Sequence, residues 1–151
     1  MKNGFSILEV IIALAILAIL AGIGFTAVVS SRTAKQLDII TDSIAAKLEE
    51  ARTNAVSGKN GTNFGLALNT TAYTYWSGSS YNQSDSSNSV YSVTPGFSIT
   101  STIPGTYHAV MFARITGVPD VTGNIIITNN QDTSTTDTII IGVLGDITVI
   151  K

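Results

Sequence analysis

The chain contains no cysteine, and several other residue types are scarce among its 151 positions. The absence of cysteine excludes disulfides, thiolate nucleophiles and thiolate metal ligands. His108 is the single histidine, so it has no second imidazole with which to bind a metal ion. No cluster of acidic, basic or nucleophilic residues typical of a catalytic site is present either. The sequence therefore predicts neither an enzyme nor a protein that holds a cofactor or a metal.

Basic residues are scarce in the C-terminal part of the chain. After Gly61 the only lysine and arginine are Lys151 and Arg114, whereas five aspartates follow Asn60. A surface that binds nucleic acid needs a cluster of cations. The composition therefore disfavours nucleic acid as a partner of this region, and the formal net charge of the whole chain is −2.

A long apolar run near the N-terminus is the most prominent feature that is present. Residues 10–29 contain one polar side chain, that of Thr26. The run matches the length of a membrane-spanning helix and exceeds the apolar core of a typical secretory signal. Simple secretory cleavage is disfavoured, because the small-residue pattern at 13–15 lies inside the run. Basic residues flank the run on both sides and leave its orientation open: Lys2, Arg32 and Lys35.

One ionisable residue, Glu9, stands just before this run. A carboxylate within a membrane-spanning helix costs roughly 2.5–3.5 kcal/mol on insertion scales. A segment that served only as an anchor would be more stable in the membrane with leucine at this position. Glu9 lies near the predicted helix start, where the helix dipole favours a negative charge, and this is one explanation for its presence.

The helical pattern continues beyond the apolar run but becomes amphipathic. Apolar residues recur at steps of three and four: Ala34, Leu37, Ile40, Ile44, Leu48, Ala51 and Ala55. The pattern predicts a helix that ends near Ser57, with Gly58 at its C-terminal cap. Because a stripe of this kind is unstable in water, it must pack against another element.

The rest of the chain predicts short antiparallel strands separated by turns. The expected strands are residues 64–68, 72–76, 90–93, 97–102, 107–115, 124–128, 138–143 and 147–150. Residues 77–89 form an expected exposed loop, and the last two strands an expected hairpin. The isoleucine runs at 125–127 and 139–141 predict burial on both strand faces, with the helix stripe against one face. The sequence therefore predicts an α+β fold, in which a long N-terminal helix packs against a C-terminal antiparallel β-sheet domain.

Several side chains in this β-rich region could suggest a binding site. His108 lies in an apparent strand, where a structural or surface role is expected. Residues 129–132 and Asp137 offer oxygen atoms, but their spacing fits no calcium loop, and an exposed polar hairpin connection is expected instead. The aromatic residues near the exposed loop are expected to pack in the core: Tyr73, Tyr75, Trp76 and Tyr81.

The stretch Gly4-Phe5-Ser6-Ile7-Leu8-Glu9-Val10, followed by the apolar helix, resembles the type IV prepilin signature. The family includes type IV pilins and the pseudopilins of type II secretion. The resemblance implies that prepilin peptidase removes residues 1–4 by cutting after Gly4 and that Phe5 is methylated. It also implies a role for Glu9, whose carboxylate would neutralise the N-terminal ammonium of a subunit being added to a filament.

Two further patterns indicate a branch of this family. Residues 48–56 resemble the L-x-x-A-R-x-x-A-V pattern at the helix end of GspH/FimT-type minor pseudopilins. Phe112, Gly117, the two isoleucine runs and residues 145–149 are similar to the closing strands of that group. The implied organisation is a cleaved leader at 1–4, a transmembrane and assembly helix at 5–29, an amphipathic helix at 30–57 and a β-rich globular domain at 58–151.

The resemblance implies a structural role, most consistent with a minor subunit of a type II secretion pseudopilus or type IV pilus. Expected partners are prepilin peptidase, other pilin or pseudopilin subunits and an inner-membrane assembly platform. The expected location is the cytoplasmic (inner) membrane, crossed once, with the globular domain outside the cytoplasm and later in a periplasmic or surface filament. The alternative is a minor type IV pilin that acts in DNA uptake or adhesion.

Overall fold

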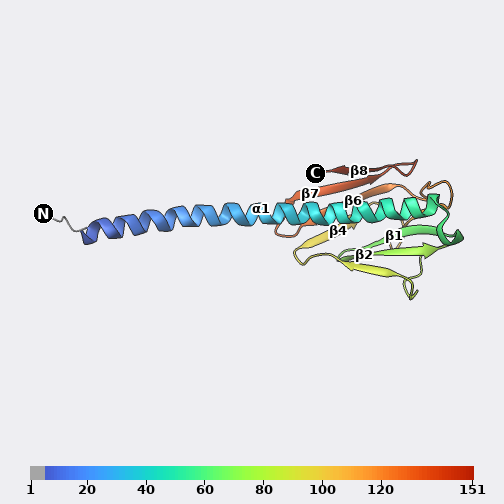
Figure 1. The fold of residues 1–151 in the computed structure, drawn as a ribbon, viewed down its shortest axis with the longest axis horizontal. Coiled ribbons are helices and arrows are strands. Elements are labelled where there is room, and N and C mark those ends of the chain that lie inside the picture. The colour runs from blue at the N-terminus through green and yellow to red at the C-terminus, as the bar shows by residue number, and fades with distance from the viewer. Residues whose placement is uncertain (1–5) are drawn as a thin grey trace. The chain divides into compact units, whose positions relative to one another are not determined.

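The computed structural model describes the backbone of residues 6–151 and the side chains of residues 6–21 and 31–151. The chain divides into two compact units, Met1–Lys35 and Gln36–Lys151. One helix, α1 (Ile7–Val56), contributes to both units, and all strands belong to the second (Figure 1). This arrangement agrees with the predicted α+β fold of a long N-terminal helix and a C-terminal antiparallel β domain.

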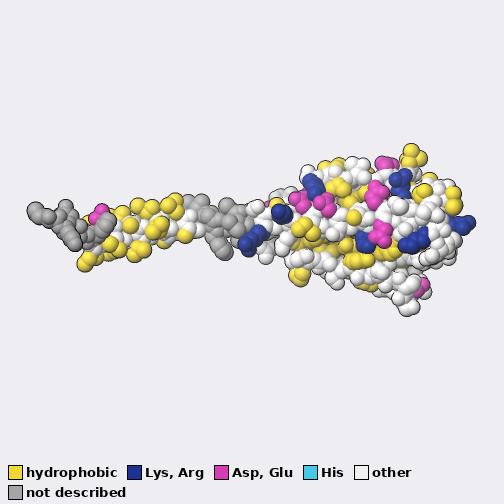
Figure 2. Space-filling model, in the orientation of Figure 1, with side chains coloured by type: hydrophobic (Ala, Val, Ile, Leu, Met, Phe, Trp, Pro, Cys, Tyr) yellow, Lys and Arg dark blue, Asp and Glu magenta, His cyan; other side chains and the backbone are white. Residues whose placement is uncertain are grey.

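In the first unit, the described part of α1 carries exposed apolar side chains. Ile7, Leu14 and Leu20 are each at least 60% exposed, and their apolar neighbours are similar. Hydrophobic side chains dominate this segment in Figure 2. Within the residues whose side chains are described, no helix is both long enough and apolar enough to cross a membrane.

In the second unit, α1 buries the stripe that the sequence predicts. The buried positions are Leu37, Ile40, Thr41, Ile44, Leu48, Ala51 and Ala55. Thr41 was not among the predicted positions, and Ala34, which was, is exposed. The helix ends at Val56, one residue before the predicted end, and Gly58 follows with φ 66°. This left-handed conformation confirms Gly58 as the capping glycine, because side chains disfavour it there.

The first sheet contains four antiparallel strands in the order β3-β2-β1-β5. They are β1 (Asn63–Asn69), β2 (Ala72–Gly78), β3 (Ser89–Ser92) and β5 (Val110–Phe112). The predicted pairing of the first two is confirmed, with Leu66 opposite Tyr75. β5 pairs with the other edge of β1, where Phe64 lies opposite Phe112.

The second sheet also contains four antiparallel strands, in the order β4-β6-β7-β8. They are β4 (Phe97–Ser101), β6 (Gly123–Asn129), β7 (Asp132–Ile141) and β8 (Ile147–Ile150). The predicted closing hairpin is confirmed by the β7–β8 register, in which Ile141 lies opposite Ile147. A backbone hydrogen bond of 2.9 Å from the Ile99 amide to the Thr70 carbonyl joins this sheet to the first.

The core lies between α1 and the two sheets. It joins the helix stripe to Phe64, Leu66, Val110 and Phe112 of the first sheet and to Ile99, Ile125, Ile127, Ile139 and Ile141 of the second. Figure 1 shows the two sheets as separate groups of strands beside the C-terminal part of α1. The expectation that the stripe packs on the isoleucine-rich strands is therefore confirmed.

The two isoleucine runs correct one prediction. Ile125, Ile127, Ile139 and Ile141 are buried, but the middle residues, Ile126 and Ile140, are only half-buried. Each run therefore buries one face of its strand rather than both. The reason is that the helix and the first sheet cover only the inner face of the second sheet.

Two strand boundaries also differ from the predictions. The strand expected at 107–115 is reduced to β5, because His108 and Ile115 have positive φ values that interrupt extended backbone toward its two ends. The strand expected at 138–143 begins earlier, at Asp132, since the turn from β6 occupies little more than Asn130 and Gln131. The connection at 129–132 is the predicted polar hairpin, whereas Asp137 lies within β7 and not in that connection.

A buried hydrogen bond connects α1 to the second sheet. The Thr41 hydroxyl donates to the Asp137 carboxylate at 2.8 Å, and the two residues are 0% and 5% exposed. A buried carboxylate without a donor would carry a large desolvation cost. Thr41 therefore compensates the burial of Asp137 and fixes the helix against β7.

A second, exposed connection lies nearby. The Lys151 ammonium forms ion pairs with Asp38 and Asp42 of α1, each with an N–O distance of 3.1 Å. The hydrogen bond with Asp38, followed by that with Asp42, raises the pKa of Lys151. Because these groups are exposed, water screens the attraction, and the pair positions β8 rather than stabilising the fold strongly.

We predict that Thr41→Val lowers the free energy of unfolding of fragment Gln36–Lys151 by about 1.5–3 kcal/mol, because the Asp137 carboxylate loses its buried donor. Urea unfolding monitored by circular dichroism measures the change. Thr53→Val is the matched control: Thr53 is exposed on the same helix, so its effect should stay within about 0.5 kcal/mol. Equal effects of the two variants would contradict this role of Thr41.

Candidate functional site

The sequence places its candidate site at the N-terminus, and the structure describes the part of it that begins at Ser6. The amides of Glu9 and Val10 donate to the Ser6 carbonyl at 3.0 and 3.2 Å, so the first helical turn forms directly after Ser6. Glu9 is the acidic residue of this first turn. A carboxylate here interacts favourably with the unpaired amides of the helix N-terminus.

The Glu9 side chain is exposed. Glu9 forms no ion pair with another described residue. The ion pairs among the described residues are those of Lys47 and Lys151. Its neighbours on the helix surface, three and four positions away, are Ser6, Ile12 and Ala13, which are also exposed. Glu9 is therefore an exposed carboxylate among exposed apolar side chains of α1.

Gly4 and Phe5, the predicted cleavage and methylation residues, lie outside the described residues. Their roles stay predictions, as does the assembly role of Glu9.

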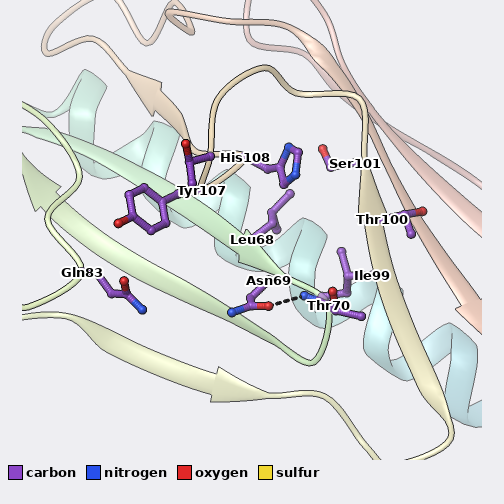
Figure 3. A pocket seen from close by; sticks show the side chains of 10 residues that line it. Leu68, Asn69, Thr70, Gln83, Ile99, Thr100, Ser101, Tyr107 and His108 are labelled. Atoms are coloured by element: carbon purple, nitrogen blue, oxygen red, sulfur yellow. Dashed lines mark hydrogen bonds between the residues drawn. The ribbon is translucent and has the colours of Figure 1, made fainter.

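A cavity of about 510 Å³ lies between the end of β1 and β4 in the second unit. Figure 3 shows that His108, Tyr107 and Gln83 line it together with residues of both strands. The complete lining is Leu68, Asn69, Thr70, Gln83, Ile99, Thr100, Ser101, Thr106, Tyr107 and His108. His108 and the Tyr107 phenol are the titratable side chains of this lining, and the others offer neutral polar or apolar groups.

His108 has a conformational role in this cavity. Its φ of 42° is uncommon for a residue other than glycine, and its Nδ1 atom lies 2.6 Å from the Ile103 carbonyl oxygen. This contact fixes the ring while the backbone turns toward β5. The expectation that His108 lies in a strand is wrong, because the turn at Gly105 brings the ring back onto the preceding segment.

The aromatic residues of β2 divide between the two faces of the first sheet. Tyr73 is buried and stacks on Tyr91 with ring centroids 5.2 Å apart, and burial raises the pKa of the Tyr73 phenol. Trp76 is 3% exposed and contacts Tyr81. The prediction of a core position is confirmed for Tyr73 and Trp76. Tyr75 is half-buried, and its hydroxyl accepts a hydrogen bond from Asn54 at 2.8 Å.

The acidic residues that follow β6 accept hydrogen bonds from other side chains of the chain. The Asp132 carboxylate accepts hydrogen bonds from Ser134 and Thr135, and that from Ser134 contributes most to lowering its pKa. Asp137 faces Thr41 in the core. Throughout the part of the chain that is described, no group of three or more histidine, aspartate or glutamate residues could hold a metal ion.

The fold resembles solved structures of a minor pseudopilin and of a type IV minor pilin. The minor pseudopilin EpsH of the type 2 secretion system of Vibrio cholerae superposes with a TM-score of 0.58 at 14% identity, over 76% of this chain and 96% of that one. The type IV minor pilin FimU of Pseudomonas aeruginosa gives 0.60 at 14% identity, over 78% and 90%. The chain has the pilin fold.

The N-terminal sequence agrees with this pilin fold. Residues 1–25 match the family described as the prokaryotic N-terminal methylation motif. No curated protein sequence matches the chain. The pilin-like chain thus joins a prepilin-type N-terminus to a domain shaped like those of minor pilins and pseudopilins, as the sequence resemblance predicts.

Sequence reasoning missed two features of this domain. The cavity is formed by residues 68–70, 83, 99–101 and 106–108, which come together only through the contact between the two sheets. The bond between Thr41 and Asp137 joins residues 96 positions apart. A polar residue within the apolar stripe was the available signal for Thr41, since a threonine on a buried face needs a hydrogen-bond partner.

We predict that His108→Val destabilises the domain by about 1–3 kcal/mol more than His108→Asn. Both variants lose the ring contact with Ile103, but asparagine adopts positive φ readily and valine does not. Urea unfolding of fragment Gln36–Lys151 measures the difference. If the two variants were equally stable, the backbone conformation at residue 108 would not be the reason for histidine there.

Proposed function

We propose that the chain is a structural, minor subunit of a type II secretion pseudopilus or a type IV pilus, with protein secretion as its process. It is made with a leader at residues 1–4, cut after Gly4 by prepilin peptidase and methylated on Phe5. Its segment 5–29 crosses the cytoplasmic membrane once and later packs in the filament. Residues 30–57 continue this helix into the globular domain at 58–151, which stays outside the cytoplasm.

The observation that carries this proposal is the match of residues 1–25 to the methylation motif in a chain that has a pilin fold. The motif supports processing by prepilin peptidase, and the fold supports assembly with other pilin-like subunits on an inner-membrane platform. The solved structures that it resembles come from a minor pseudopilin and a minor pilin, which supports a minor rather than a major subunit.

Glu9 supplies the electrostatic step of assembly in this proposal. After cleavage the new N-terminus is an ammonium group, and a carboxylate on a neighbouring helix about 4 Å away attracts it by roughly 4 kcal/mol at an effective dielectric constant near 20. This attraction exceeds the cost of roughly 2.5–3.5 kcal/mol for placing a carboxylate in a membrane-spanning helix. Apolar packing changes little when a helix leaves lipid for a protein-lined core, so the ion pair helps to direct the transfer.

We predict that the mature chain begins at Phe5 and carries one N-terminal methyl group in a host with prepilin peptidase. Intact-protein mass spectrometry of the membrane and filament fractions measures this. Gly4→Val should leave the leader attached, because a side chain at this position obstructs close approach of the protease to the backbone. A chain that retains Met1, or that begins after the apolar segment, would contradict the proposed processing.

We predict that Glu9→Leu is inserted and processed normally but that its share of the sheared filament fraction falls at least about tenfold. Removing an attraction of several kcal/mol costs more than the 1.4 kcal/mol that corresponds to a factor of ten. Glu9→Asp keeps the charge and is the control, with a smaller loss. Quantitative immunoblotting of membrane and filament fractions gives both values, and normal incorporation of Glu9→Leu would exclude the ion pair.

A further inference from the structure

Five exposed aliphatic side chains surround the C-terminal end of α1 and are called here the end patch: Val56, Ile115, Val118, Val143 and Leu144. They are between 41% and 72% exposed. The remaining large hydrophobic side chains exposed in residues 36–151 lie away from this end: Ile39 is 17 positions before Val56 on α1, Val90 is on β3, Tyr107 precedes β5 and Ile150 is on β8. Apolar surface in the domain is thus concentrated at this one end.

The end patch is held in place by bonds between three separate segments. The Ile115 amide donates to the Ala55 carbonyl at 2.9 Å, which attaches the loop after β5 to the last turn of α1. Arg52 donates through Nη2 to the Leu144 carbonyl at 3.3 Å, which attaches the β7–β8 turn to the same turn of the helix. Gly117 and Gly145 allow the two loops to meet, since a Cβ at Gly145 would lie 2.5 Å from the Gly117 carbonyl oxygen.

Ile115 shows that this surface is maintained at an energetic cost. Its φ is 74°, a left-handed conformation that β-branched residues avoid. Its side chain is nevertheless 62% exposed, so burial in the chain's own core does not compensate for the strain. Strained backbone of this kind gathers at functional and binding sites. An asparagine or glycine would satisfy the turn better, so the fold alone does not explain an isoleucine here.

Basic side chains without carboxylate partners lie beside the end patch. Arg52 contacts both loops, Lys59 follows the end of α1, and the Arg114 guanidinium lies near Gly61. Among the residues described here, none of the three cations forms an ion pair, whereas Lys47 and Lys151 do. Figure 2 shows hydrophobic and basic side chains next to one another over this end of the domain.

The acidic residues near this end do not neutralise the three cations. Glu49 lies one turn before Arg52 on α1, and Asp146 follows Gly145, but neither forms an ion pair there. The Asp146 carboxylate instead lies against Gly142. The surface therefore combines exposed aliphatic groups with unpaired positive charge.

We propose that the end patch docks a neighbouring, different protein subunit, whose contacting surface presents a carboxylate beside aliphatic side chains. The inference rests on the proposed function, because that subunit belongs to the same filament. Burying the aliphatic groups supplies the attraction, and a carboxylate pairs with a guanidinium through two parallel hydrogen bonds, which fixes the orientation. A nucleic acid would satisfy the cations but offers no aliphatic side chains for Ile115, Val143 and Leu144.

The test is photocrosslinking of the full chain in its own host. A benzophenone amino acid replaces Leu144 in the end patch, and as the matched control it replaces Val90, which is 65% exposed on β3. We expect Leu144 to crosslink to another subunit of the filament, identified by mass spectrometry, and Val90 to give at least tenfold less of this product. The same samples report the mature N-terminus, so processing is measured independently.

Two sets of variants separate docking from folding. Ile115→Asn removes an aliphatic group while relieving the strained backbone, so we expect equal or higher thermal stability together with at least a tenfold loss of the crosslink. The double variant Lys59→Glu/Arg114→Glu should lose the crosslink to a similar extent, because both side chains are exposed and contribute charge rather than packing. Lys59→Arg with Arg114→Lys keeps the charges and should retain the crosslink.

Each other outcome overturns the proposal. A processed chain in filaments that forms no Leu144 crosslink excludes docking at the end patch and leaves the proposed function intact. A crosslink to a second copy of this chain makes the end patch a self-association surface. A salt-dependent mobility shift of double-stranded DNA that the two glutamate substitutions abolish reassigns the surface to nucleic acid. A chain that is never processed removes both the proposed function and the filament partner.

Discussion

The burial of one helix stripe between two sheets is the interaction on which the domain depends. Neither four-stranded sheet has a core of its own, and both bury their apolar faces against α1 and each other. Ile44 and Leu48 are fully buried at the centre of this contact. The same helix carries Glu9 at its other end. A single continuous element therefore holds the domain together and presents the group proposed to act in assembly.

Much of this fold could be predicted because it follows from local periodicity. Three features follow from residues close together in the sequence. They are the buried stripe from Leu37 to Ala55, the capping glycine at 58 and the closing hairpin. The errors arise where distant segments decide the conformation. The expected strand at 107–115 is shortened to β5 because the backbone turns at His108, whose ring contacts the Ile103 carbonyl, and at Ile115. Ile126 and Ile140 stay half-buried because only one face of their sheet is covered.

The functional surfaces also differ in whether they are formed by nearby residues or by distant segments. The prepilin-like motif is contiguous, so the sequence alone could place Gly4, Phe5 and Glu9 and suggest their roles. The end patch could not be predicted, because Val56, Ile115 and Leu144 lie in segments that hydrogen bonds bring together only in the folded domain. An exposed isoleucine with positive φ leaves no signal in the sequence. A site made from one segment can be read from the chain, whereas a site made from three requires the structure.

Trp76, the only tryptophan of the chain, has a consequence for measurement. It lies in the first sheet, where its ring covers Gly65 and leaves no room for a Cβ there. The strands of the second sheet contain neither tryptophan nor tyrosine. Tryptophan fluorescence therefore reports on the first sheet, whereas far-ultraviolet circular dichroism averages over both sheets and the helix. Coincident unfolding transitions in these two signals would show that both sheets separate from the helix together.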